Sequence, residues 1–179
     1  EFRRVLFRSV YGSTGAGSLP HLGMELFKLR ANISATHVPY KGAGPALIDL
    51  IGGQIQLTFS QPPIVLPHIK SGKLKGLAIT SPKRLAALPE FPTVAESGVP
   101  GFDATSWQGI VAPAATPRDS LVKLNGAILK ALAAPEMKEL WARQGMEIYM
   151  TTLEQAASRL RGDYERYGKL IKDAGIKAE

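Results

Sequence analysis

The sequence has 179 residues, of which 45% are hydrophobic, so it is long enough for one large domain or two small ones with a sizeable core. It contains no cysteine, which excludes disulfides, thiolate zinc sites and cysteine nucleophiles. The net charge is +7, but the basic residues are scattered and do not interleave with aromatic ones. A solvated basic surface is therefore favoured over a nucleic-acid-binding surface. No apolar run is long enough to span a bilayer.

The first nine residues, EFRRVLFRS, do not resemble a natural protein segment. They can be back-translated into a string that resembles the end of a common sequencing-library adapter. We therefore set residues 1–10 apart as an artefactual segment, and we expect the natural N-terminal portion to be missing. The alternative is a short basic amphipathic arm. A longer contig with a different sequence upstream of Val10 would decide between the two.

Residues Tyr11–Leu22, YGSTGAGSLPHL, predict a glycine-rich loop that leads into a helix. Ser18 suits the N-cap and Pro20 suits the first helical turn. A helix start presents unpaired backbone N–H groups and the positive end of the helix dipole, and glycines let a ligand approach closely. The stretch therefore predicts a small anion site for a carboxylate or a phosphate. An ordinary strand-to-helix turn explains the same residues equally well.

Helices and strands alternate through the first half of the chain. Hydrophobic periodicity and breaker residues predict helices at Ser18–Arg30, Pro45–Ile51 and Ile64–Lys70, and strands at Asn32–Tyr40, Gln54–Ser60 and Leu74–Thr80. This succession implies an α/β unit with a mainly parallel sheet and helical covers.

The second half changes to helix. After an irregular segment with one helical turn at Thr93–Ser97, we expect a strand at Thr105–Ala112 and a short strand at Met146–Met150. Helices are predicted to begin near Thr116, where Asp119 occupies a capping-box position, at Pro135 and at Thr151. Their apolar stripes are expected to be core faces: Leu121, Leu124, Ile128 and Leu132, and then Leu153, Ala157, Leu160, Tyr164, Tyr167 and Ile171. These helices lack a sheet of their own, and we expect the missing N-terminal portion to supply it.

Four motifs then occur in the order that is typical of one family. They are YGSTGAGSLPHLGMELFK, HVPYKGAGPALIDLIGGQIQLTF, LPHIKSGKLKGLAITSPKRLAALPEFPTVAESGVPGF and SWQGIVAPAATP. From about Tyr11 to Ala178 the chain resembles the substrate-binding proteins of tripartite tricarboxylate transporters, the Bug receptors. The resemblance implies a type II periplasmic-binding-protein fold, in which two α/β domains close on a small ligand that is usually a carboxylate.

On this resemblance the chain divides at residue 104. Residues 11–104 would form most of the second α/β domain, and residues 105–179 would form the interdomain crossing and the C-terminal part of the first domain. The implied function is a periplasmic solute receptor that captures a small carboxylate and delivers it to membrane transporter subunits. The full-length protein is expected to be a monomer that binds no nucleic acid, needs no cofactor and does not insert into the membrane.

The resemblance also assigns ligand-binding residues. The glycine-rich loop would hold one carboxylate through N–H and hydroxyl donors of Ser13, Thr14, Gly15, Gly17 and Ser18. This agrees with the anion site inferred from the helix start.

The remaining assigned residues lie in the VPYKG loop, at a strand end and on the crossing segment. In the VPYKG loop, the hydroxyl of Tyr40 is expected to point into the cleft. Many relatives carry an acidic residue where Ser60 stands, and a serine favours an anionic ligand more than an aspartate would. These residues are Tyr40, Lys41 and Gly42 in the VPYKG loop, Phe59 and Ser60 at a strand end, and Trp107 on the crossing segment.

Other functions are less well supported by the residues. The three histidines show no metal-ligand spacing, and His21 is interpreted as a packing or hydrogen-bonding residue. No Ser–His–Asp set or carboxylate pair can be assembled, so we expect no enzyme. Two alternatives remain: a hydrolase or transferase that uses a hydroxyl of the glycine-rich loop, and a polyanion-binding protein suggested by charge alone.

Overall fold

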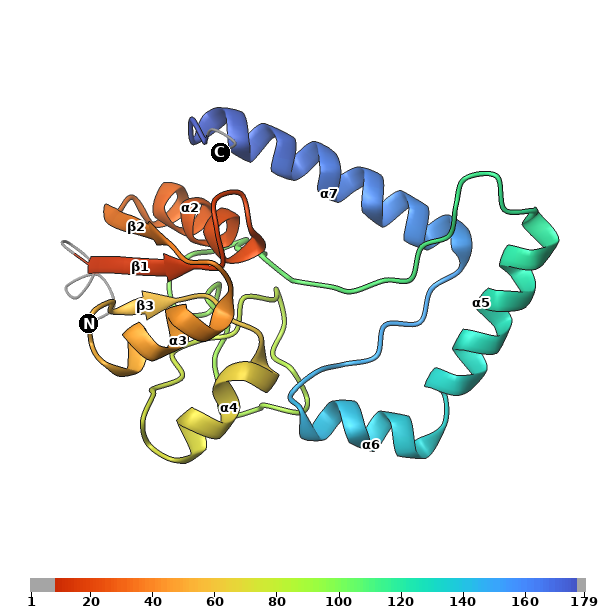
Figure 1. Cartoon of the computed structure of the whole chain (residues 1–179), viewed down its shortest axis with the longest axis horizontal. Coiled ribbons are helices and arrows are strands. Elements are labelled where there is room, and N and C mark those ends of the chain that lie inside the picture. The colour runs from red at the N-terminus through yellow and green to blue at the C-terminus, as the bar shows by residue number, and fades with distance from the viewer. Residues whose placement is uncertain (1–8, 177–179) are drawn as a thin grey trace.

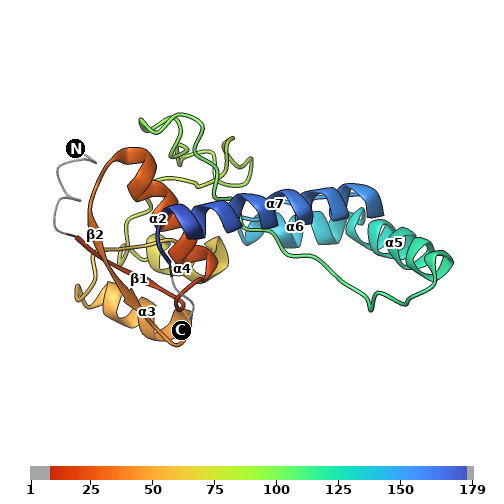
Figure 2. The ribbon, with the colours of Figure 1, turned by 90° about the horizontal axis from the view of Figure 1, so that it is seen from above.

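The computed structural model describes residues 9–176 and divides into an α/β unit and a helical C-terminal part (Figure 1). The α/β unit holds the sheet together with helices α2, α3 and α4. Helices α5, α6 and α7 extend to one side of this unit, as both views show (Figure 2). The predicted adapter-derived residues lie mostly outside the described part, but strand β1 includes Ser9 and Val10. The strand therefore begins two residues before the expected domain boundary.

The sheet has three parallel strands in the order β2-β1-β3. They are β1 (Ser9–Ser13), β2 (Ala35–Pro39) and β3 (Leu57–Thr58). Helix α2 (Leu19–Ala31) joins β1 to β2, and α3 (Ala43–Ile51) joins β2 to β3. Because the strands run in the same direction, the loops that follow them meet at one edge of the sheet. This arrangement confirms the predicted order of alternating helices and strands up to β3.

One hydrophobic core covers the sheet. It includes Tyr11 of β1, Met24 and Phe27 of α2, and Val94 and Phe102 from the irregular segment. Burying each of these side chains stabilises the fold by about 1.5–3 kcal/mol. The irregular segment therefore belongs to the core although it contains no regular element. Its predicted helical turn is present, because the N–H of Ser97 donates to the carbonyl of Thr93.

Two predicted strands of this half differ from the structure. Strand β3 is shorter than Gln54–Ser60, because the N–H groups of Gln54 and Ile55 donate to Asp49 at the end of α3. The prediction of a strand at Leu74–Thr80 is wrong: only Ile79 forms a bridge, to Thr93. The backbone of Ile79 pairs with residues 92 and 94 of the irregular segment, which takes the place of a neighbouring strand. Helix α4 (Pro62–Lys70) confirms the third predicted helix.

The C-terminal part contains α5 (Arg118–Leu132), α6 (Pro135–Arg143) and α7 (Leu153–Asp173), close to the predicted helices. The strands predicted at Thr105–Ala112 and Met146–Met150 are absent from the described chain, where both segments lie outside any sheet. A strand needs a hydrogen-bonding partner, and the three-stranded sheet pairs neither segment.

The predicted helix caps are partly wrong. Pro117 occupies the N-cap of α5, and no side chain caps that helix, so the proposed capping box of Thr116 and Asp119 does not form. At α7 the capping box is present but shifted by one residue from Thr151. Thr152 is the N-cap, and its hydroxyl accepts a hydrogen bond from the N–H of Gln155.

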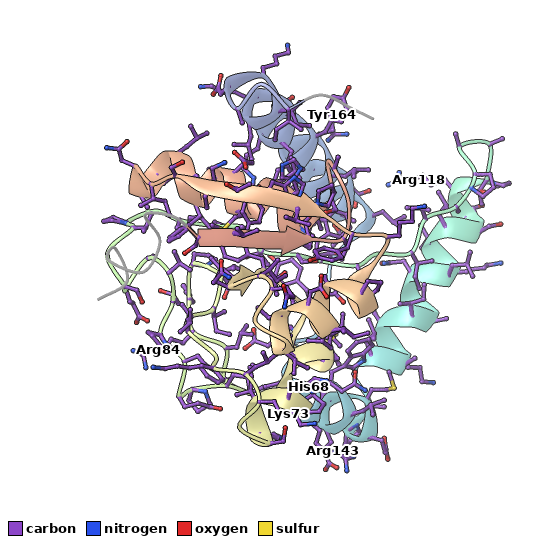
Figure 3. All side chains as sticks on the ribbon, turned by 60° about the vertical axis from the view of Figure 1, so that its left-hand side comes forward. His68, Lys73, Arg84, Arg118, Arg143 and Tyr164 are labelled. Atoms are coloured by element: carbon purple, nitrogen blue, oxygen red, sulfur yellow. The ribbon has the colours of Figure 1, made fainter. Side chains whose placement is uncertain are left out.

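The apolar stripes of the C-terminal helices are largely exposed. Helices α5 and α6 have no buried residue among those described, and Leu124 and Leu160 are each 53% exposed. Tyr164, labelled on α7 in Figure 3, is 82% exposed. The expectation that these stripes are core faces is therefore wrong for this chain. Their exposure agrees with the view that a partner sheet is lacking.

The C-terminal part returns to the α/β unit at two places. Helix α7 ends beside α2, where Leu170 is buried (Figure 1). At the end of α6, a Cβ on Gly145 would lie 2.8 Å from Leu66 and 2.9 Å from Leu88, and this residue has a φ of +72°. Nearby, the N–H of Ala86 donates to Glu147 over 2.9 Å. The close approach at Gly145 therefore requires a glycine.

Candidate functional site

Three loops converge at the edge of the sheet where the strands end. The N–H of Tyr40, just after β2, donates to the carbonyl of Ser13 over 3.0 Å. On the other side of β1, the hydroxyl of Thr58 donates to the carbonyl of Gly12 over 2.9 Å. The structure thereby brings together the loops that carry most of the predicted site residues. Parallel α/β sheets bind ligands at this edge.

The loop Ser13–Ser18 has the backbone that its glycines suggest. Gly15 has a φ of +130° and Gly17 a φ of +72°, which side chains other than glycine rarely tolerate. The carbonyl of Gly15 accepts hydrogen bonds from the N–H of Ser18 (3.3 Å) and from its hydroxyl (2.7 Å). The loop is therefore a compact turn that leads directly into α2.

The hydroxyls of this loop differ in how they are used. Ser13 is only 1% exposed, and its Oγ donates to the carbonyl of Gly15 and lies 2.6 Å from Nε2 of His37. Ser18 occupies the N-cap of α2, as predicted, but its hydroxyl donates to Gly15 and does not cap the helix. The first turn of α2 thus has no side-chain cap. Thr14 is half-buried, and no hydrogen bond of its hydroxyl occurs within the described chain.

The loop after β2 carries three of the predicted site residues. The hydroxyl of Tyr40 donates to Oδ2 of Asp49 on α3 over 2.7 Å, which raises the pKa of Tyr40. This hydroxyl therefore supports α3, and its expected place in a cleft stays a prediction. Lys41 is exposed and forms no ion pair within the described part of the chain. Gly42 is the N-cap of α3 with a φ of +111°.

The last three predicted residues lie in different surroundings. The ring of Phe59 packs between Phe27 and Phe102, with centroids 6.2 and 6.3 Å away, so it belongs to the core. Ser60 is exposed just after β3. Nε1 of Trp107 donates to Oδ2 of Asp163 on α7 over 2.6 Å, which ties the crossing segment to that helix.

Sequence reasoning missed a buried polar network behind the loop. His21 and His37 stack with ring centroids 3.9 Å apart and an interplanar angle of 9°. Burial, reinforced by the neighbouring His21, lowers the pKa of His37 to about 4. Beside them, burial and a hydrogen bond to Glu25 raise the pKa of Tyr11. The register of β1 and β2 places Tyr11 opposite His37, and the sequence alone does not contain this register.

The Ser13–His37 contact bears on the hydrolase alternative. A serine nucleophile must reach its substrate, but Ser13 is fully enclosed. The alternative therefore gains no support from this pair. Among residues 9–176, no cluster of three or more histidine or acidic side chains is placed to hold a metal ion, and no helix is both long and apolar enough to cross a membrane.

Residues 7–176 match the family model described as the tripartite tricarboxylate transporter family receptor. The chain belongs to this family. It is 38% identical over 161 residues to protein BugT of Bordetella pertussis, covering 90% of the chain and 49% of that protein. It is also 36% identical over 169 residues to a protein encoded between tcbD and tcbE in Pseudomonas sp. strain P51, covering 94% of the chain and 50% of that protein. The chain thus spans about half the length of these curated relatives.

Solved structures of the receptor family share the fold. R. palustris Rpa4515, solved with adipate, superimposes with a TM-score of 0.87 at 34% identity, over 98% of this chain and 59% of that one. The periplasmic binding protein BugD superimposes with a TM-score of 0.81 at 31% identity, over 96% of this chain and 58% of that one. MatC from Rhodopseudomonas palustris, with bound malate, superimposes with a TM-score of 0.74 at 27% identity, over 92% of this chain and 56% of that one. The expected α/β fold of periplasmic binding proteins is confirmed, and the family consists of receptors, not enzymes.

Proposed function

We propose that this chain is part of a periplasmic receptor that binds a small dicarboxylate at the loop Ser13–Ser18. The observation that carries the proposal is the uncapped start of α2, preceded by two glycines of positive φ, at the carboxyl edge of the sheet. Such a helix start attracts an anion through its N–H groups and its dipole. Two structural relatives were solved with dicarboxylates, adipate and malate.

The donors that would hold the carboxylate are the hydroxyl of Thr14 and the N–H groups of Ala16 and Leu19, which have no hydrogen-bond partner within the described chain. The N–H groups of Gly15 and Ser18 already donate to Oγ of Ser13 and to the carbonyl of Gly15, so they would shape the turn. Ser13 would act from behind, since its side chain is enclosed. Lys41 and Ser60 lie after the neighbouring strands, where their exposed side chains could approach a second carboxylate. Gly17 would shape the turn, because its N–H already donates to Nδ1 of His21. Phe59 and Tyr40 would support the site without touching the ligand.

The second half of the cleft would come from another α/β domain. In this proposal residues 11–104 form one domain, and residues 105–179 cross to the other and complete it. Helices α5 and α6 have no buried residue among those described, which supports this division, as does the length of the relatives, about twice that of the chain. Trp107 would then lie at the crossing, where it could form a wall of the cleft.

The family also suggests what happens to the captured ligand. Receptors of tripartite tricarboxylate transporters hand their solute to membrane subunits, and we propose the same role and the same compartment here. The full-length receptor would act as a monomer that closes on one ligand.

A thermal-shift screen tests the proposal. The protein is expressed from the longest reading frame that contains residues 10–179 and is heated with adipate, malate, citrate and benzoate in turn. A ligand at about 100 times its dissociation constant should add about 2.7 kcal/mol of stability. Among these ligands, a dicarboxylate is expected to raise the midpoint temperature of unfolding most. No shift with any of these carboxylates, at concentrations up to about 10 mM, would contradict the proposal.

A further inference from the structure

Two histidines from different elements form one stacked pair beneath the glycine-rich loop. His21 lies in the first turn of α2 and His37 in the middle of β2, and their rings are 3.9 Å apart and nearly parallel. The ring of Tyr11 lies 4.9 Å from His37 and 6.4 Å from His21, so the three rings form one compact cluster. His21 is only 7% exposed. His21 is thus buried, and His37, which is partly buried, stacks against it from β2.

Each ring contacts the loop through one nitrogen. Nδ1 of His21 accepts the N–H of Gly17 over 3.0 Å, close to the end of the loop. Nε2 of His37 lies 2.6 Å from the Oγ of Ser13, at its beginning, and the same oxygen accepts the N–H of Gly15 over 3.2 Å. The pair thus contacts the loop at both ends.

We infer that His21 and His37 are positioning residues, which hold the loop Ser13–Ser18 in the conformation that binds a carboxylate. The inference rests on the proposed function of the loop. Neither side chain touches the ligand. His21 fixes Gly17 at its positive φ, and His37 fixes the hydroxyl of Ser13, so that the open N–H groups at the start of α2 keep their direction.

The hydrogen bond from Gly17 requires that Nδ1 of His21 carry no proton. The titratable groups that face it are Tyr11 from β1 and Glu25 and Lys28 from α2. Oε1 of Glu25 accepts from the hydroxyl of Tyr11 and from Nζ of Lys28 (2.7 Å), and it lies 3.9 Å from Nε2 of His21. Glu25 is thus already engaged by two donors. A proton on Nδ1 of His21 would remove the acceptor of Gly17, and two stacked imidazolium rings would repel each other.

Two substitutions of His21 separate its hydrogen bond from its stacking. His21→Asn places an oxygen at the position of Nδ1 and keeps an acceptor for Gly17, but it loses the stacked ring. His21→Phe keeps a ring against His37 and loses the acceptor. His68, on α4 in Figure 3, provides the matched control His68→Asn. All variants are made in the protein expressed from the longest reading frame that contains residues 10–179.

The first readout does not depend on any ligand. The amide of Gly17 is observed by nuclear magnetic resonance after labelling with 15N-glycine, and its hydrogen exchange is measured at pH 7. We expect His21→Phe to speed this exchange about tenfold, while His21→Asn and His68→Asn stay within about threefold of the parent, as loss or retention of one hydrogen bond implies. Equal effects of the asparagine and phenylalanine variants would overturn the inference.

The second readout is adipate affinity by calorimetric titration. His21→Phe should weaken it about fivefold to tenfold, and His21→Asn should restore most of the loss, although neither residue touches the ligand. A parent protein that binds no carboxylate would remove the proposed function, while the Gly17 amide would still decide whether the histidine holds the loop. Adipate affinity that is identical in all variants would overturn the positioning role.

Discussion

Trp107 and Asp163 form a hydrogen bond of 2.6 Å between the crossing segment and α7. Asp163 also forms an ion pair with Arg166 over 3.0 Å, and the same arginine donates to the carbonyl of Asp103 over 3.1 Å. These contacts tie the start of the crossing segment to the helix that returns to the α/β unit. They lie where the chain would pass between the two domains of a complete receptor.

Replacing Trp107 should test this connection. Trp107→Phe keeps an aromatic ring and removes the donor, so it should lower the free energy of unfolding by about 1 kcal/mol. Urea unfolding followed by circular dichroism measures the change. Asp163→Ala removes the acceptor and is the matched partner variant, and in a double-mutant cycle the two effects should not add. Full additivity would show that the two side chains are not coupled.

Lys41 should contribute only modestly to ligand binding. If backbone donors and the helix dipole hold the carboxylate, Lys41→Met should weaken dicarboxylate binding by about 1 kcal/mol. The exposed Lys73 at the end of α4, shown in Figure 3, provides the control Lys73→Met, which should have no effect. Complete loss of binding in Lys41→Met would instead make this lysine the main counter-ion of the ligand.

The low pKa of His37 predicts a loss of stability in acid. Its pKa of about 4 in the folded state lies below the ordinary value of 6.5, because burial disfavours the charged ring. The associated stability is complete above pH 6.5 and is lost as the pH falls towards 4. Urea unfolding at pH 7.5, 5.5 and 4.5 measures how the free energy of unfolding changes with pH.

The variant His37→Gln separates this effect from that of other groups. The pKa values of Glu96 and Glu154 are lowered chiefly by hydrogen bonds to Thr93 and Arg118. The stabilising contributions of these two carboxylates to the fold are therefore also lost in acid. They remain in the variant, so only the contribution of residue 37 should disappear. The variant should therefore be less sensitive to pH between 6.5 and 4. An unchanged slope would contradict the assignment.

The exposed stripes predict that the 179-residue chain associates with itself. Leu124 and Leu160 are half-exposed, and Val111 is 86% exposed. Large apolar side chains that are exposed in this number promote association. Sedimentation velocity at increasing concentration should show species larger than the monomer. The double variant Leu124→Gln with Leu160→Gln should shift the distribution towards monomer, whereas a parent chain that is monomeric at all concentrations would contradict this prediction.

The sequence predicts helices better than strands in this chain. The apolar spacing and the prolines locate α4, α6 and α7, because those signals are local. The residue pattern at Leu74–Thr80 and Thr105–Ala112 indicates only a preference for the extended conformation. A strand forms only where the edge of another strand is available for pairing. The backbone groups of Ile79 form hydrogen bonds with the irregular segment. Residues 105–112 have no strand beside them within the described chain.

The site was predictable to a similar degree. The convergence of three loops follows from parallel strands, and the glycines at 15 and 17 indicate a tight turn. The partners of individual side chains depend on register and packing, which periodicity does not contain. Ser13 meets His37 because β1 pairs with β2, and Tyr40 meets Asp49 because α3 folds back over the loop. These contacts give Ser13 and Tyr40 partners within the protein, and we therefore propose that both support the site.

The most direct test of the account is a calorimetric titration of adipate into the Gly17→Val variant and its parent, both expressed from the longest reading frame that contains residues 10–179. Gly17 has open space around it and a φ of +72°, so valine would strain the loop backbone without a clash in the core. We predict that the parent binds adipate and that the folded variant does not, while Gly162→Val on α7 binds like the parent. Normal affinity in a folded Gly17→Val variant would show that the glycine-rich loop is not the carboxylate site.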